Sequence, residues 1–357
     1  MSWNREPVSE TTTTPSFEPI GDRPVRWGVL GPGRIAAGVV RDLADVHGGV
    51  LHAVASRSAE RARAFADEHD APVSYGSYEQ LLADPDVDVV YVATPHRQHH
   101  GIALAAVQAG KHLLVEKAFT VTLAGSQQVV DAARARGVFV MEAMWTRFQP
   151  AVVRLRELIA EGAIGDVRSV RADLGLRVPF EATDRLWDPA QGGGALLDLG
   201  VYPTSWLQMV LGGVPTSLDV AGVLGPNGVD SESTLLWHTE DGRHGVGTCS
   251  LLSPLPGQAA VFGTEGWIEV PPRFHHPGRL VVHRTGGGRS VESSEELVRS
   301  ATGTGYSHEL DEVHRCLAAG LTESPVMPLD DTLAVMSVLE QALHALGVHH
   351  DEDPAAI

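Results

Sequence analysis

One turn near the start of the chain constrains the fold more than any other feature. Residues 26–30 (RWGVL) form a short apolar run, and the segment GPGRIA at 31–36 joins it to a helical pattern. Gly31 permits a tight turn, Gly33 leaves room for a pyrophosphate, and Ala36 lets the helix pack closely on the strand. The helix N-terminus then presents free N–H groups to phosphate oxygens. The pattern predicts a dinucleotide-binding unit, whose expected turn contacts are Gly31, Gly33, Arg34 and Ile35.

The rest of the chain divides into two patterns near residue 145. Six short apolar runs alternate with helical segments up to that point, which predicts a doubly wound parallel sheet, the Rossmann fold. Strand-like segments then follow one another from 218 to 284 with little helix between them, which predicts an α+β domain with a mainly antiparallel sheet. The expected α/β chain has a flexible tail at 1–24, a Rossmann domain at 25–145, a second domain at 146–348 and a frayed end at 349–357.

Charge and cysteine content limit the classes of partner and site. The chain has 357 residues and a formal charge of −18, which disfavours non-specific binding to nucleic acid or anionic membranes. Its two cysteines, Cys249 and Cys316, exclude a disulfide scaffold and fit a reducing compartment. No long stretch has the pattern of a transmembrane helix or a secretion signal. We expect a cytoplasmic protein without nucleic-acid or membrane partners, and no metal site.

The end of the second predicted strand indicates which dinucleotide is bound. An Asp or Glu at this position binds the ribose hydroxyls of NAD. Here the segment reads Ala55-Ser56-Arg57-Ser58, so the acid is absent and an arginine lies in its neighbourhood. A guanidinium can bind a 2′-phosphate through two hydrogen bonds and stack on adenine. We therefore predict NADP in preference to NAD, with Ser56 and Arg57 as contacts.

Two further groups of residues lie where a cleft is expected. Glu116 and Lys117 end the fifth apolar run, and open parallel sheets bind ligands beyond the carboxyl ends of their strands. Asp198 and Tyr202 are four residues apart, so they share one face of the helix expected at 195–211. Taken separately, a lone lysine or an Asp–Tyr pair at this spacing is more often structural than catalytic.

The order of these motifs resembles the Gfo/Idh/MocA oxidoreductases. GPGRIA, SRS, TPH, VEK and D-x-G-x-Y follow one another as they do in that family. The segments at 141–150, 194–203 and 306–329 are similar to its branch of NADP-dependent dihydrodiol and D-xylose dehydrogenases. The resemblance covers roughly residues 25 to 347. It implies a Rossmann domain followed by a substrate domain whose open-faced sheet forms a homodimer or a higher homo-oligomer.

The resemblance also implies roles for individual residues. Its catalytic group would be Lys117, Asp198 and Tyr202. The segments after the fourth and fifth strands would contact the cofactor through Thr94, Pro95, His96, His99, Glu116 and Lys117. The aromatic stretch at 145–148 matches a substrate-facing segment of the branch, and the expected substrate contacts are Trp145, Arg147, Phe148 and Tyr202.

The chemistry of a dehydrogenase fits this set. The nicotinamide exchanges hydride with a carbinol carbon, and the protein takes or gives the hydroxyl proton. Tyr202 is expected to do so, with its usual pKa of about 10 lowered by the Lys117 ammonium. Lys117 is the competing proton donor, and Asp198 is expected to orient the lysine or the substrate hydroxyls.

One position departs from the family pattern. The family usually has a proline after the lysine, whereas this chain has Ala118. A cis peptide before alanine costs about 2.5–4 kcal/mol, against about 0.5–1 kcal/mol before proline. The bond is therefore either a strained cis peptide or a trans peptide that places Lys117 differently.

The expected substrate is a small polyhydroxylated ring or its carbonyl form, either an aldose such as D-xylose or a trans-dihydrodiol. An anhydrosugar reductase or an inositol-type dehydrogenase is the alternative among enzymes. A non-catalytic NADP-binding sensor is the alternative of another class. The joint presence of Lys117, Asp198 and Tyr202 argues against a sensor, and Ala118 argues weakly for it.

Overall fold

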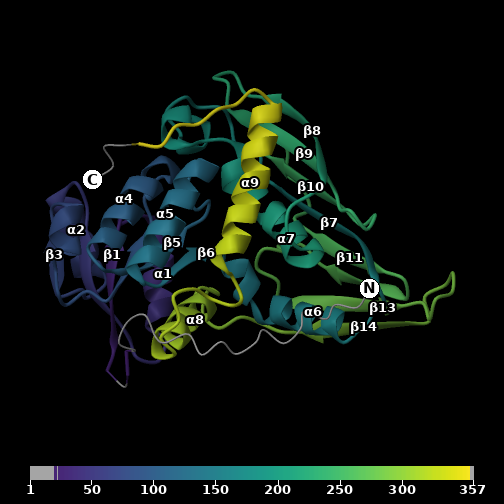
Figure 1. Cartoon of the computed structure of the whole chain (residues 1–357), viewed down its shortest axis with the longest axis horizontal. Coiled ribbons are helices and arrows are strands. Elements are labelled where there is room, and N and C mark those ends of the chain that lie inside the picture. Colours follow the sequence, from purple (N-terminus) through teal and green to yellow (C-terminus); the bar gives the residue numbers. More distant parts are fainter. Residues whose placement is uncertain (1–19, 22, 354–357) are drawn as a thin grey trace.

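The N-terminal domain is built on a six-stranded sheet. The computed structural model describes residues 20, 21 and 23–353 (Figure 1). The strand order is β3-β2-β1-β4-β5-β6, and every neighbouring pair is parallel. The order reverses between β1 and β4, which is where such sheets open a crevice for a ligand. The predicted doubly wound sheet is confirmed. Its strands are β1 (Val25–Leu30), β2 (Gly49–Ala55), β3 (Val73–Tyr75), β4 (Val89–Val92), β5 (His112–Glu116) and β6 (Val140–Ala143).

Helices connect these strands and begin next to the crevice. Helix α1 starts directly after Gly33 and buries the side that carries Val39 and Leu43. Helix α4 starts at His96, directly after its N-cap Pro95. The connecting helices are α1 (Arg34–Leu43), α2 (Ala59–Glu68), α3 (Tyr78–Leu82), α4 (His96–Gln108) and α5 (Leu123–Arg136).

The second domain is built on an eight-stranded mixed sheet. The strand order is β14-β13-β12-β11-β7-β10-β9-β8, and only β7 and β10 pair in parallel among the strands of this sheet in the described chain. This confirms the predicted mainly antiparallel sheet. Its strands are β7 (Val167–Gly175), β8 (Ser217–Leu224), β9 (Asp230–His238), β10 (His244–Ser250), β11 (Ala259–Gly263), β12 (Gly266–Val270), β13 (Arg279–Arg284) and β14 (Ser293–Val298).

The remaining helices join the two domains. Helix α7 packs against β7 and β10, and α9 lies between α7 of the second domain and α5 of the first, as Figure 1 shows. Helix α8 packs on α1. These contacts hold the second domain over the carboxyl ends of the Rossmann strands. The helices are α6 (Pro150–Ala160), α7 (Val201–Leu211), α8 (Ser307–Ala318) and α9 (Leu329–Ala345).

Two details differ from the prediction. Strand β14 was not predicted because its residues are polar and mostly exposed, so it has no apolar alternation. The segment at 195–211 is helical as predicted, but it begins with a π-helical turn over Leu196–Gly200. Among the described residues, no helix is long and apolar enough to span a membrane.

The two predicted tails have different outcomes. Residues 1–19 and 22 lie outside the described residues. The prediction of a frayed end from residue 349 is wrong for the residues up to 353. The backbone N–H of Asp353 donates to the carbonyl of Arg97 at 3.0 Å. The Glu352 carboxylate accepts bonds from the backbone N–H and the hydroxyl of Thr122 at 2.9 and 2.7 Å. The polar composition of the segment concealed this attachment to α4 and α5.

Candidate active site

The turn before α1 has the shape of a phosphate cradle. Gly31 has φ +90°, and a Cβ there would lie 2.8 Å from the carbonyl oxygen of Ala93. Gly33 is the N-cap of α1 and makes no side-chain capping bond. The nearest atom to a Cβ on Gly33 would be 4.0 Å away, so the space before the helix N-terminus is open. The buried Thr94 hydroxyl beside the turn has no hydrogen-bond partner. Free N–H groups, open space and an unsatisfied hydroxyl all fit a dinucleotide.

Two arginines lie near the end of β2. Ser56 is buried, and Arg61 donates a 3.4 Å hydrogen bond to its hydroxyl. Arg57 is exposed. Burial raises the pKa of Tyr78, while the charges of Arg57 and Arg61 act to lower it, so both guanidinium groups lie near that ring. Sequence reasoning identified Arg57 but missed Arg61, although its position four residues later, on the first turn of α2, was a usable signal.

A cavity of about 340 Å³ lies beyond the carboxyl ends of β4 and β5. It adjoins the phosphate turn through Ile35 and extends to the second domain through Tyr202. Residues from three separate parts of the chain therefore meet around one space. The lining residues are Ile35, Ala93, Thr94, Pro95, His96, Glu116, Lys117, Arg185, Asp198 and Tyr202.

Lys117 reaches across this cavity from the end of β5 to the second domain. Its ammonium donates a 2.9 Å hydrogen bond to the carbonyl of Asp198 and lies 3.7 Å from the Asp198 carboxylate. The same ammonium lies 5.0 Å from the centre of the Tyr202 ring. The Lys117–Ala118 peptide, left open by the sequence, is cis. The structure thus brings together the three predicted catalytic residues.

The backbone around Asp198 fixes the direction of its carboxylate. Asp230 accepts a 2.6 Å hydrogen bond from the backbone N–H of Leu196, which begins the π-helical turn. A Cβ on Gly194 would lie 2.1 Å from the Asp230 carboxylate, so only glycine fits there. Burial alone would raise the pKa of Asp198, but Lys117 and Arg185 hold it far below its usual range. The carboxylate is therefore ionised throughout the neutral pH range.

Tyr202 differs from the prediction in its acidity. The indole N–H of Trp145 donates a 3.1 Å hydrogen bond to the Tyr202 hydroxyl. Burial, assisted by the charge of Glu116, raises the pKa of Tyr202 well above its usual range. The expectation of a lowered pKa is wrong, because burial and the charge of Glu116 outweigh the nearby Lys117 ammonium. At neutral pH the side chain is a neutral phenol, which can donate a proton.

Glu116 lines the cavity at the end of β5. It is 8% exposed, and the hydroxyl of the fully buried Tyr91 donates a hydrogen bond to its carboxylate. Its other oxygen accepts a 3.2 Å bond from the backbone N–H of Lys117. Burial raises the pKa of Glu116, and the Lys117 charge opposes that rise. Glu116 thus lines the cavity next to Lys117, and its contact with the cofactor stays a prediction.

The two histidines of α4 brace the backbone. The ring nitrogens of His96 lie 3.1 Å from the carbonyls of Gly192 and Lys117. Those of His99 lie 3.0 and 2.7 Å from the carbonyls of Ala118 and Thr94. Burial lowers the pKa values of His96 and His99 to about 3 and 4, so both rings are neutral. His96 lines the cavity, whereas His99 is fully buried and cannot touch a cofactor; its predicted contact is wrong.

Only one of the three predicted side chains at 145–148 reaches the cavity region. Trp145 stacks between Tyr306 and His276, with ring centres 4.5 and 4.9 Å apart. Arg147 points elsewhere and pairs with Asp331, so its predicted substrate contact is wrong.

Phe148 also departs from its predicted substrate contact. It lies beside Val153 and His308, away from the Tyr202 cavity. The cause is the 3₁₀ turn Trp145–Phe148, because successive side chains of such a turn point in different directions.

Sequence reasoning missed further residues at the site. Arg185 lines the cavity, and its guanidinium donates a 2.8 Å hydrogen bond to the Asp198 carboxylate. The ring of His275 lies 5.3 Å from that of Tyr202. Both residues lie in irregular segments between regular elements, and neither carries a motif in this chain. Tyr306 lies inside the segment 306–329, which resembles the family, but the resemblance implied no role for this residue.

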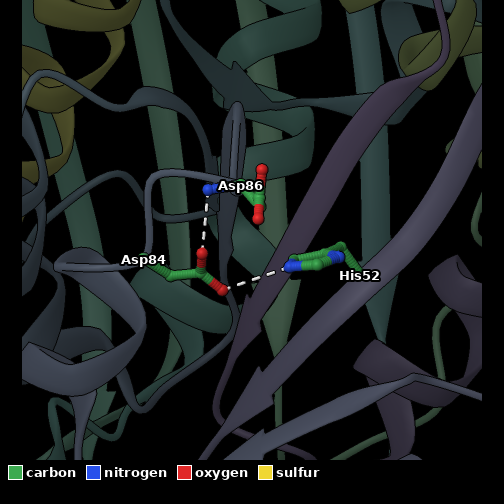
Figure 2. Close-up of side chains that lie close together, drawn as sticks. All are labelled: His52, Asp84 and Asp86. Carbon is green, nitrogen blue, oxygen red and sulfur yellow. Dashed lines mark hydrogen bonds and ion pairs between the residues drawn. The ribbon is translucent and has the colours of Figure 1, made fainter.

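One cluster within the described residues has the composition of a metal site. His52, Asp84 and Asp86 each offer a ligand atom within 4.8 Å of the others. Figure 2 shows the three side chains close together. The Asp84 carboxylate already accepts hydrogen bonds from the hydroxyl of Tyr75 at 3.0 Å and from the backbone N–H of Asp86 at 2.8 Å. Asp86 is paired with Arg26. We therefore interpret the cluster as a network of ion pairs, separate from the residues that line the cavity.

Comparison with known proteins agrees with this geometry. Residues 25–144 match the "Oxidoreductase family, NAD-binding Rossmann fold" of the Gfo/Idh/MocA group, and residues 152–269 match its C-terminal domain. The trans-1,2-dihydrobenzene-1,2-diol dehydrogenase of Xenopus tropicalis is 37% identical over 327 residues, which is 90% of this chain and 98% of the relative.

Solved structures extend the comparison. A 3-ketoreductase from Actinomadura kijaniata, crystallised with NADP and TDP-benzene, has a TM-score of 0.78 and 26% identity over 90% of this chain and 98% of its own. An aldose-aldose oxidoreductase from Caulobacter crescentus shares the fold with a TM-score of 0.81 at 24% identity, over 91% of this chain and 98% of its own. This chain belongs to the Gfo/Idh/MocA family of NAD(P)-dependent oxidoreductases and is similar to its dihydrodiol dehydrogenases.

Proposed function

We propose that this protein is an NADP-dependent dehydrogenase or reductase that acts on a carbinol or carbonyl carbon of a small polyhydroxylated ring, such as D-xylose or a trans-dihydrodiol. The observation that carries the proposal is the meeting of Lys117, Asp198 and Tyr202 around one cavity. That cavity is continuous with the residues next to the phosphate turn, so a dinucleotide seated on α1 would present its nicotinamide there.

Each of the three residues has a role in proton transfer. The nicotinamide supplies or accepts the hydride. In the reduction direction the neutral Tyr202 phenol donates a proton to the oxygen of the substrate, consistent with its raised pKa. The Lys117 ammonium stabilises the negative charge that develops on that oxygen and is the competing donor. Asp198 holds the lysine in place through its carbonyl and carboxylate.

NADP preference rests on the end of β2. Residues 56–59, directly after the strand, include no carboxylate, and two guanidinium groups lie near Ser56 and Tyr78. An adenosine 2′-phosphate carries the charge and the planar oxygen pattern that arginine binds. One solved neighbour, the 3-ketoreductase, is crystallised with NADP, which supports this choice.

The proposed substrate class rests on the cavity wall, and the proposed oligomer rests on the exposed face of the eight-stranded sheet. The His275 ring beside Tyr202 offers a flat face to a substrate ring, while Asp198 on the cavity wall binds its hydroxyl groups. The eight-stranded sheet exposes apolar side chains such as Val223 and Val298, and we propose that it forms the interface of a homodimer or a higher homo-oligomer.

The direct test is absorbance during NADP⁺ reduction with a panel of aldoses, cyclitols, anhydrosugars and dihydrodiols, and with NAD⁺ in parallel. We expect turnover with one ring class. Tyr202→Phe is expected to lower kcat by roughly 100-fold or more, with unchanged NADPH affinity. Tyr75→Phe is the matched control, because its hydroxyl binds Asp84 outside the cavity. Wild-type kcat in Tyr202→Phe would refute the proton-donor role. NADPH binding without turnover across the panel would favour a sensor instead.

A further inference from the structure

Arg185 is anchored in the cavity by a single carboxylate. It enters from the 3₁₀ turn Arg185–Trp187, and one terminal nitrogen donates to Asp198 at 2.8 Å. Its side chain is 40% exposed, whereas that of Asp198 is 14% exposed. Asp198 also pairs with Lys117, so one carboxylate fixes two cations on the wall of the same cavity.

Most of the hydrogen-bonding capacity of Arg185 is unused. A guanidinium has five N–H donors in a planar fork. Within the described part of the chain, the bond to Asp198 is the one hydrogen bond that this side chain makes. The bond to Asp198 holds the guanidinium in one orientation. Its remaining donors are partly open to the cavity. This is the arrangement expected of a residue that binds a ligand oxygen rather than one that only braces the fold.

The position of Arg185 relative to Lys117 limits which oxygen it can bind. The reacting oxygen of the substrate must approach Lys117 and Tyr202. Arg185 and Lys117 approach the same oxygen of Asp198, Oδ1, at 2.8 and 3.7 Å, so the two cations are neighbours on the cavity wall. An oxygen bound by the free donors of Arg185 therefore lies next to the oxygen that approaches Lys117. On a small ring, that neighbouring oxygen is on the carbon next to the reacting one.

We propose that Arg185 binds the oxygen on the carbon adjacent to the reacting carbon, and so makes the site selective for vicinal diols and their α-hydroxy carbonyl products. The inference rests on the proposed function for the identity of the reacting end. It goes beyond that function by naming the residue that binds the second oxygen of the substrate. A substrate without that oxygen forgoes a charge-assisted hydrogen bond to the guanidinium, which costs affinity.

The test uses trans-cyclohexane-1,2-diol and cyclohexanol, which differ in one vicinal hydroxyl. Dissociation constants are measured by ligand-observed NMR titration of the full chain saturated with NADP⁺. The wild type is expected to bind the diol roughly tenfold more tightly than the alcohol. Arg185→Gln is expected to bind both with equal affinity. Arg185→Lys retains the charge but not the planar fork, and we expect it to recover only part of the preference. Arg177→Gln, an exposed arginine on the same connecting segment, is the control.

Two results would overturn the inference: equal affinity of the wild type for both compounds, or an unchanged preference in Arg185→Gln. A preference that is lost in Arg177→Gln as well would also overturn it, because the effect would then not be specific to the cavity. Turnover is scored separately. If the diol preference depends on Arg185 but no hydride is transferred, the proposed function fails while the role of Arg185 stands. NADP⁺ affinity in each variant reports whether the cofactor site is intact.

Discussion

The indole N–H of Trp145 donates a 3.1 Å hydrogen bond to the hydroxyl of Tyr202 and thereby joins the end of the Rossmann domain to helix α7. The indole itself is held between the rings of Tyr306 and His276. This contact fixes one lone pair of the Tyr202 oxygen and leaves its own O–H free for a substrate. Trp145 therefore orients the proposed proton donor and opposes part of the rise in its pKa.

Replacing Trp145 with phenylalanine tests this relationship. The substitution keeps the ring stack but removes the N–H donor. The hydrogen bond from that N–H lowers the pKa of Tyr202. We expect that pKa to rise further and kcat to fall by about 5- to 30-fold, the equivalent of one hydrogen bond. Steady-state kinetics and NADPH titration measure the two effects, and NADPH affinity is expected to stay unchanged. Trp267→Phe, in the eight-stranded sheet, is the control. A kcat within twofold of wild type would contradict the role of the indole N–H.

Cofactor choice is tested at the end of β2. Arg57→Gln and Arg61→Gln each remove one guanidinium near the expected 2′-phosphate. We expect NADPH affinity to fall at least about tenfold in each variant, because bonds to charged groups contribute more than neutral ones. NADH affinity is expected to change little. Fluorescence titration with both cofactors measures this, and Arg63→Gln on the exposed side of α2 is the control. Equal losses for NADH and NADPH would show general damage to the adenosine site.

The domain architecture could be predicted because local chemistry determines it. The GPGRIA turn works through backbone freedom at Gly31 and open space at Gly33, both of which depend on residue type alone. Buried parallel strands such as β4 require continuous apolar runs, which are visible in the sequence. Polar strands carry no such signal, which is why β14 was missed.

The site was less predictable because its properties depend on tertiary contacts. The raised pKa of Tyr202 comes from burial and from Glu116, which is 86 residues away in the chain (202 − 116) and meets it only in the folded state. Arg147 belongs to the right segment but points to Asp331, because a 3₁₀ turn set its direction. Arg185 has no motif around it, and only its contact with Asp198 marks it as part of the site.

Metal removal tests the interpretation of the cluster around His52. Its carboxylate oxygens are already bonded to protein donors, including Tyr75 and Arg26. We expect EDTA to leave the melting temperature within about 1 °C, since a ligand that binds the native state would otherwise stabilise it. Added Zn²⁺ is expected to have no larger effect on the wild type than on His52→Asn. A fall in melting temperature on chelation that Zn²⁺ reverses in the wild type alone would show that the cluster binds metal.

Acid stability is tested at the base of the Rossmann sheet. Burial alone would raise the pKa of Asp88, but hydrogen bonds from Arg23 and Arg26 lower it to about 2. A lowered pKa stabilises the native state above the unfolded value near 3.9, and this contribution is lost as the pH falls toward 2. We expect Asp88→Asn to reduce the free energy of unfolding by about 1–2 kcal/mol at pH 7, because both arginines are partly exposed.

The pH dependence of that difference separates the charge from the shape of the side chain. Urea unfolding at pH 7, 5, 4 and 3 is expected to give a constant difference between wild type and Asp88→Asn down to about pH 4. The difference is then expected to shrink, because the carboxyl of the unfolded wild type, with a pKa near 3.9, takes up a proton that the native carboxyl does not. Asp45→Asn, an exposed carboxyl on the same domain, is expected to match the wild type at every pH. A difference that stays the same at pH 3 would mean that Asp88 acts through packing, and that the two arginines contribute little to stability.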